Sequence, residues 1–179
     1  MRKLIIYIAA SLDGYIAKPN DDLSFLKLVE KENEDYGYAA FTATIDTIIL
    51  GRKTYDWVLK EIGPGHYDNG DRTIYVITRT PKQSQGNIHF YNGSLVELVT
   101  QLKSAKGKNI YCDGGSEIIN ELLKSRLIDE LIISVIPVLV GGGTRLFKEN
   151  IPEEKLELIG SKTFDTGLVQ LHYKTKNHE

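Results

Sequence analysis

Residues 47–54 are Thr47-Ile48-Ile49-Leu50-Gly51-Arg52-Lys53-Thr54, an apolar run that passes through one glycine into a polar segment. An uninterrupted apolar run is typical of a strand in a parallel sheet that helices cover on both faces. A short helical pattern follows at about 53–60, so the strand is expected to run directly into a helix. This junction predicts an α/β fold.

The rest of the chain alternates between the same two kinds of pattern. Runs rich in Ile, Val and Tyr, bounded by turn residues, predict strands at about 3–10, 46–50, 73–78, 88–91, 109–112, 130–137, 156–164 and 168–175. Helical patterns predict helices at about 24–43, where Asn33 could interrupt the helix, at 53–60, after an N-cap at Ser94, and at 116–125.

These elements define the expected architecture. The last two strands are joined by the short turn Asp165-Thr166-Gly167, which favours an antiparallel hairpin. We therefore predict a single α/β domain over residues 1–179. It would contain a mixed, mostly parallel sheet of about eight strands, with helices on both faces and a C-terminal antiparallel hairpin.

Composition excludes several classes of function. The chain has 22 basic and 24 acidic residues, a net charge of −2, so no basic excess favours nucleic-acid binding. The longest apolar stretch, Leu131–Val140, is too short to cross a membrane. The single cysteine, Cys112, cannot form an internal disulfide, which fits a cytoplasmic protein. The scattered histidines form no zinc motif, so no metal is expected.

Two strand ends have the features of phosphate-binding turns. Gly51 joins a strand to a helix, whose free N–H groups and positive dipole end favour a phosphate, and Arg52, Lys53 and Thr54 add charge and a hydroxyl donor. A second strand ends in Asp113-Gly114-Gly115-Ser116-Glu117, where two glycines precede another helix. Taken alone, such a glycine pair is more often an ordinary turn.

A third strand end adds a basic group at the same edge. The strand that ends in Thr78 and Arg79 supplies a hydroxyl and a guanidinium, which can grip a phosphate monoester through two hydrogen bonds. Ligands of open α/β sheets bind beyond the carboxyl ends of the strands. Two phosphate-sized turns and a third basic strand end therefore predict a dinucleotide with an extra phosphate, NADPH rather than NADH.

Together, these segments resemble the dihydrofolate reductase superfamily. The closer resemblance is to the reductase domain at the C-terminal end of bifunctional riboflavin-biosynthesis deaminase–reductases, which also has small stand-alone bacterial relatives. It covers residues 1 to about 175. The segments that carry it are Ser11-Leu12-Asp13-Gly14-Tyr15-Ile16-Ala17, Gly51-Arg52-Lys53-Thr54-Tyr55, Tyr75-Val76-Ile77-Thr78-Arg79, Gly114-Gly115-Ser116 and Pro137-Val138-Leu139-Val140-Gly141-Gly142-Gly143-Thr144-Arg145-Leu146-Phe147.

The resemblance implies NADPH as the hydride donor and a homodimer as the assembly. It implies cofactor-binding residues in four places. These are Gly51, Arg52, Lys53 and Thr54 at the pyrophosphate and adenosine; Thr78 and Arg79 at the adenosine 2′-phosphate; Gly114, Gly115, Ser116 and Glu117 at the pyrophosphate and nicotinamide; and Ala9 and Ile16 beside the nicotinamide ring. Because Glu117 is acidic, it could lie beside a phosphate only if its side chain turned outward.

On the substrate side, the resemblance suggests two catalytic residues. Dihydrofolate reductases have one acid on the helix before the first glycine turn, and counting back without a gap reaches Asp35. Asp35 would orient an aminopyrimidine ring and assist protonation, provided that burial raised its pKa. The charged run 30–35 around it is equally typical of a solvated face. Ser134 matches a strand hydroxyl that supports this acid.

Two further residues are expected near the substrate. The resemblance places Asp13 in the loop that closes over the nicotinamide, although Asp13-Gly14 is first of all a turn signal. The glycines at 141–143 would border the substrate pocket, and Arg145 beside them is a candidate contact for a substrate phosphate.

These observations leave three functions open. The first is an NADPH-dependent reductase of a pyrimidine- or pterin-like molecule, most like 5-amino-6-(5-phosphoribosylamino)uracil reductase of riboflavin biosynthesis. The second is a dihydrofolate reductase, which would need Asp35 as its ring anchor. The third, of another class, is a non-catalytic NADPH-binding module, which cofactor-dependent thermal stabilisation without turnover would identify.

Overall fold

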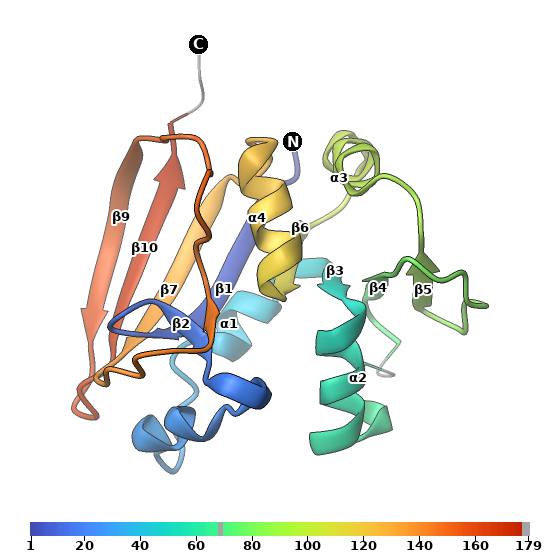
Figure 1. Cartoon of the computed structure of the whole chain (residues 1–179). Helices are drawn as coiled ribbons and strands as arrows, with labels where there is room; N and C mark the ends of the chain where they lie inside the picture. Colours follow the sequence, from blue (N-terminus) through green and yellow to red (C-terminus); the bar gives the residue numbers. More distant parts are fainter. Residues whose placement is uncertain (68–69, 177–179) are drawn as a thin grey trace.

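The structure is a computed structural model that describes residues 1–67 and 70–176. Its main element is an eight-stranded sheet, with β9 and β10 at one end and β5 at the other (Figure 1). In sheet order, the strands are β5 (Ile88–Tyr91), β4 (Thr73–Ile77), β3 (Ile45–Gly51), β6 (Asn109–Gly114), β1 (Leu4–Ser11), β7 (Glu130–Ile136), β10 (Val169–Thr175) and β9 (Leu156–Thr163).

The predicted strands are confirmed to within one or two residues at each end. Neighbouring strands are parallel from β5 to β7, whereas β10 is antiparallel to both β7 and β9. The C-terminal hairpin is thus confirmed. In the turn between its strands, the Gly167 N–H donates to the Phe164 carbonyl at 3.0 Å. The parallel part of the sheet brings the carboxyl ends of β3, β4 and β6 to one edge.

Helices cover both faces of the sheet, as the apolar runs predicted. One core lies under α3 (Leu95–Ser104) and α4 (Ser116–Lys124), around Ile6, Ile49 and Ile119. The other lies under α1 (Tyr38–Thr42) and α2 (Arg52–Glu61). No helix within the described ranges has the length and apolar character needed to cross a membrane.

The helical pattern expected at 24–43, with a possible break at Asn33, does not form one helix. The structure has a 3₁₀ helix, η2 (Ser24–Val29), then an irregular segment, and then the short α1. Asn33 and Tyr36 have positive φ angles of 61° and 56°, a conformation that ends a right-handed helix. The charged run therefore forms a connection, and Asn33 does interrupt the helical pattern.

A small second sheet had no sequence signal. It pairs β2 (Tyr15–Ala17) with β8 (Thr144–Arg145), which are too short to show a period. The two segments approach closely because Gly143 has no side chain. A methyl group at Gly143 would lie 2.1 Å from the Ala17 carbonyl oxygen, and the φ of Gly143 is 123°. This pairing holds the loop after β7 against the turn after β1. Two further 3₁₀ helices, η1 (Pro19–Asp21) and η3 (Pro64–His66), lie in loops.

Candidate functional site

The glycine turns after β3 and β6 meet at the carboxyl edge of the sheet. A methyl group built on Gly51 would lie 3.7 Å from the Gly115 nitrogen and 3.3 Å from Ile118 Cγ1. One built on Gly115 would lie 3.2 Å from Thr54 Oγ1. The absence of side chains at Gly51 and Gly115 therefore lets the two turns pack closely against each other, and we call the place where they meet the notch.

Each turn also opens a helix whose first N–H groups have no side-chain cap. Gly51 is the N-cap of α2 and Gly115 is the N-cap of α4, and neither helix has a capping side chain. Uncapped N–H groups and the positive end of the helix dipole attract an anion. The two helices present these groups at the same notch, so the structure brings together the two phosphate-binding turns predicted from the sequence.

Basic side chains lie around this notch. Arg52 forms an ion pair with Asp56 at 2.7 Å, and its guanidinium carbon lies 5.7 Å from the centre of the Phe90 ring. Lys53 and Arg79 are exposed. Both lower the pKa of Glu117, although the main cause of that shift is the Lys148 ammonium, which pairs with it. Lys53 and Arg79 thus both act on the Glu117 carboxyl, although the three residues come from three different strand ends.

Glu117 turns outward, which is the orientation that the sequence analysis required of an acid beside the predicted phosphate site. Its side chain is 81% exposed and paired with Lys148. Two other predicted cofactor residues use their hydroxyls within the protein. Ser116 Oγ donates to the Arg145 carbonyl at 2.6 Å, and Thr78 Oγ1 lies 3.1 Å from the Thr80 carbonyl and accepts from the Thr80 N–H. These two hydroxyls donate to carbonyl groups of the protein and so stabilise the turns. At these two residues, the backbone N–H groups are the donors left for a ligand.

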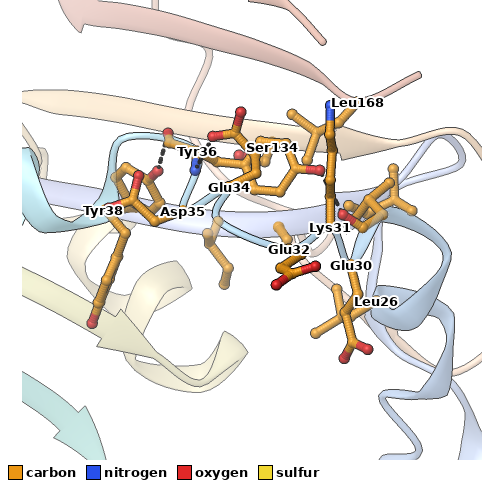
Figure 2. Close-up of a pocket in the computed structure, with 15 residues that line it drawn as sticks. Leu26, Glu30, Lys31, Glu32, Glu34, Asp35, Tyr36, Tyr38, Ser134 and Leu168 are labelled. Carbon is orange, nitrogen blue, oxygen red and sulfur yellow. Dashed lines mark hydrogen bonds between the residues drawn. The ribbon is translucent and has the colours of Figure 1, made fainter. Parts of the chain in front are cut away.

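A pocket of about 540 Å³ lies beside β1 and β7, against η2 and the irregular segment that follows it (Figure 2). Its lining includes three of the predicted residues, Ala9, Asp35 and Ser134, so the structure brings these together. The complete lining is Tyr7, Ile8, Ala9, Leu26, Val29, Glu30, Lys31, Glu32, Glu34, Asp35, Tyr36, Tyr38, Ser134, Ile136 and Leu168.

The burial required for Asp35 to act as an acid is absent. Asp35 is exposed, and it lies before α1 rather than on a helix. Its carboxylate accepts the N–H groups of Ala39 and Gly37 at 2.9 and 2.8 Å, which lowers its pKa instead of raising it. A short polar side chain that hydrogen-bonds the backbone two to four residues ahead favours a turn or a cap. This explains why Asp35 lies before α1 and not on a longer helix. Asp35 still lines the pocket, so contact with a substrate stays a prediction.

Ser134 lies in a buried polar network at the wall of the pocket. It pairs with Ala9 across β1 and β7, and its Oγ lies 3.2 Å from Gln170 Nε2. Gln170 Nε2 also lies 3.0 Å from the Tyr7 hydroxyl, which donates to the Tyr36 carbonyl at 2.8 Å. This network fixes the wall between the sheet and the irregular segment.

Asp13 and Arg145 do not line the pocket. The Asp13 carboxylate accepts from Ser11 Oγ at 2.6 Å and from the N–H groups of Val140 and Gly141, contacts that lower its pKa to about 2. Its acceptor capacity is therefore used to join the turn after β1 to the glycine loop. Arg145 lies over the ring of Tyr15, 4.9 Å from its centre. Ile16, beside Tyr15, is half-buried against the core near α4.

Sequence reasoning assigned no role to Asp113, which the structure makes the centre of a tyrosine cluster. Tyr67 donates to one of its carboxylate oxygens at 2.7 Å and Tyr111 to the other at 2.6 Å. Burial raises the pKa of Asp113 despite these bonds. Burial, and then the nearby Asp113, raise the pKa of Tyr38 to about 12. Since Tyr38 lines the pocket, the cluster reaches from the glycine turn to the pocket wall.

The register between β6 and β3 explains the placement of Asp113. Cys112 pairs with Ile49 and Gly114 with Leu50, so Asp113 is an extra residue that has no partner in β3. Such bulges re-aim side chains and are common beside active sites. The one available sequence signal was an acid immediately before two glycines at a strand end.

Comparison with known proteins identifies the family. Residues 2–170 match the model of the RibD C-terminal domain. The chain belongs to the RibD C-terminal domain family. It is 44% identical to YwjB, an uncharacterized protein of Bacillus subtilis (strain 168), over 173 residues, which cover 96% of this chain and 97% of YwjB.

Solved structures agree with the family. A putative riboflavin biosynthesis protein from Shewanella sp. PV-4 is 33% identical, with a TM-score of 0.86 over 98% of this chain and 99% of the other. Dihydrofolate reductase from Enterococcus faecalis, solved with NADP(H), is 19% identical, with a TM-score of 0.66 over 98% and 97% of the two chains. The expected dihydrofolate reductase-like fold is thus confirmed, and the RibD C-terminal family is the one that the sequence analysis favoured.

Proposed function

We propose that this RibD-family chain is an NADPH-dependent reductase that transfers hydride to a carbonyl or imine carbon of a small pyrimidine-like molecule. The observation that carries the proposal is the contact between the glycine turns and the pocket. A methyl group built on Gly114 would lie 3.9 Å from Ile8 Cδ1, and Ile8 lines the 540 Å³ pocket. A dinucleotide held at the glycine turns would therefore end beside the pocket.

The residues at the notch fit the cofactor. Uncapped N–H groups at Gly51 and Gly115 would hold the pyrophosphate, and the exposed Arg79 is the group available for a 2′-phosphate. NADPH, when bound, supplies the hydride, and the protein supplies position and a proton.

The proton-delivery role fits Asp113 better than Asp35. A half-buried carboxyl with a raised pKa retains its proton nearer to neutral pH than an exposed carboxyl that accepts two N–H bonds. Tyr111 and Tyr38 would connect Asp113 to the pocket, because Tyr111 is bonded to Asp113 and Tyr38 lines the pocket close to both. In the protonated state, Asp113 would donate to the Tyr111 hydroxyl instead of accepting from it, and that hydroxyl would pass its own proton toward the pocket. Asp113 is accordingly proposed as the proton source for the reduced substrate.

Thermal stabilisation tests the cofactor proposal without any substrate. NADPH should raise the unfolding temperature, and NADH at the same concentration should do so much less. Arg79→Ala should remove most of this difference, while Lys106→Ala, an exposed lysine at the opposite edge of the sheet, should leave it unchanged. Equal stabilisation by the two cofactors would contradict the role of Arg79. Stabilisation without oxidation of NADPH by any pyrimidine or pterin would favour the non-catalytic module.

We further propose that the chain forms a homodimer through β9. This edge strand is exposed along nearly its whole length, including Leu156, Leu158 and Ile159, which are 42%, 54% and 48% exposed. An uncovered apolar edge strand is prone to pair with another chain. Light scattering after size-exclusion chromatography should give twice the chain mass, and Leu158→Lys should yield monomers. The cytoplasmic location stays a prediction; Cys112 is free and buried, as a reducing compartment permits.

A further inference from the structure

The pocket beside Ser134 has a strongly acidic rim. Four of its lining residues are carboxylates, Glu30, Glu32, Glu34 and Asp35, and the one basic residue in that lining is Lys31. Lys31 forms an ion pair with Asp165, and the lysine lowers the pKa of that carboxyl. The positive charge of Lys31 is thus balanced by Asp165. The pocket therefore offers no unpaired cation to an anionic ligand.

The acidic residues differ in what they contact. Glu34 and Asp35 accept backbone N–H groups, from Tyr36 at 2.7 Å and from Gly37 and Ala39. Glu30 and Glu32 are exposed, and no hydrogen bond or ion pair in the described residues holds their carboxylates. These two residues are thus available to repel an anion or attract a cation.

The inner wall of the pocket is apolar. Ile8, Leu26, Val29, Ile136 and Leu168 supply it, together with the aromatic faces of tyrosines. Apolar walls with a few polar groups suit a flat ring that carries hydrogen-bonding substituents. The basic groups of the site lie instead at the notch, where the cofactor phosphates are proposed to bind. The two halves therefore carry opposite charge.

We infer that the substrate of this pocket is a flat heterocyclic carbonyl or imine compound that is uncharged or cationic and carries no phosphate. This inference rests on the proposed reductase function. Phosphate recognition in proteins uses arginine, lysine or helix N-termini. Arg145, the residue expected to bind a substrate phosphate, lies over Tyr15 and outside the lining. A dianionic phosphate placed here would face carboxylates instead.

Binding of a matched pair of pyrimidines tests this inference. The probes are 5-amino-6-ribosylaminouracil and its 5′-phosphate, titrated by calorimetry into the protein loaded with NADP⁺, so that no turnover occurs. The unphosphorylated compound should bind at least about tenfold more tightly at low salt. The difference should shrink at about 0.5 M salt, because ions screen the repulsion between exposed charges.

Variants assign the effect to the two free carboxylates. The double substitution Glu30→Gln/Glu32→Gln should tighten binding of the phosphorylated compound several-fold and change binding of the other compound little. The matched control is Glu97→Gln/Glu121→Gln, which removes two exposed glutamates from α3 and α4, away from the pocket. The control should leave the ratio of the two affinities unchanged.

Three results would overturn the inference. The first is equal or tighter binding of the phosphorylated compound, and the second is a ratio of the two affinities that changes neither with salt nor with the double substitution. The third is no binding of the unphosphorylated compound at millimolar concentration. Failure of the reductase proposal would show differently, as the absence of stabilisation by NADPH before any pyrimidine is added. A protein that binds NADPH and prefers the phosphorylated compound would keep the proposed function and lose the inference.

Discussion

Replacing Asn120 by alanine should destabilise the wall of the cofactor notch. Asn120 is 3% exposed and lies on α4, one turn after Ser116. Its Nδ2 donates to the Leu146 carbonyl at 2.8 Å, and its Oδ1 accepts the Lys148 N–H at 2.8 Å. These bonds join the helix to the segment that follows β8.

The magnitude follows from the groups left without a partner. Each buried polar group that loses its hydrogen bond costs about 1–3 kcal/mol, and Asn120→Ala strands the Leu146 carbonyl and the Lys148 N–H. We expect the free energy of unfolding to fall by about 3 kcal/mol. For a chain of this length, that corresponds to a fall of about 6–12 °C in melting temperature.

Urea unfolding followed by circular dichroism measures this change. The midpoint should fall while the slope of free energy against urea concentration stays the same. Glu121→Ala is the matched control, since Glu121 is the next residue on α4 and is exposed, so its change should be within about 0.5 kcal/mol. A loss below about 1 kcal/mol for Asn120→Ala would show that water replaces both bonds and that the reasoning is wrong.

Three further outcomes are expected. Asp113→Asn should lower kcat about 100-fold and leave the Kd of NADPH nearly unchanged, because the substitution removes a proton source. Steady-state kinetics measure this, and an unchanged kcat would contradict the role of Asp113. Gly51→Ala, whose methyl group would lie 3.3 Å from Ile118 Cγ1 and 3.7 Å from the Gly115 nitrogen, should raise the Kd of NADPH about tenfold by calorimetry; unchanged affinity would remove Gly51 from the notch. The contacts of Asp13 lower its pKa from 3.8 to about 2, so its contribution to stability should be complete above pH 3.8 and be lost as the pH falls through about 2; acid unfolding of Asp13→Asn should lack this component, and identical profiles for the two proteins would exclude it.

The sheet was predictable because its signals are local. Apolar runs such as 47–50 and the turn at 165–167 lie within single segments of the chain, and each was placed correctly. The segment 24–43 breaks near Asn33, as the sequence allowed, but only short helical turns form on either side of the break. Its charged part, 30–35, has no apolar face to bury, and Asp35 hydrogen-bonds the backbone ahead of it. The pairing of β2 with β8 joins segments more than a hundred residues apart and could not be read from either one.

The candidate site was predictable where backbone conformation mattered and not where side chains met. The strand-end glycines could be found because parallel strands bring their carboxyl ends to one edge. The role of Asp113 depends on Tyr67, 46 positions away, and on a bulge that no single segment shows. Asp13 was assigned to the substrate because its environment, two N–H groups of the loop at 140–141, could not be known from the sequence.

The bulge in β6 places an acid beside the glycine turn without using a position of the ladder. Because Asp113 has no counterpart in β3, the pairing passes directly from Cys112 and Ile49 to Gly114 and Leu50. Deleting Asp113 would leave both pairs in register, so the two glycines and the start of α4 would keep their places. The deletion would instead remove the carboxylate that accepts from Tyr67 and Tyr111. The one residue of β6 that the ladder does not require is therefore the residue that holds the tyrosines together.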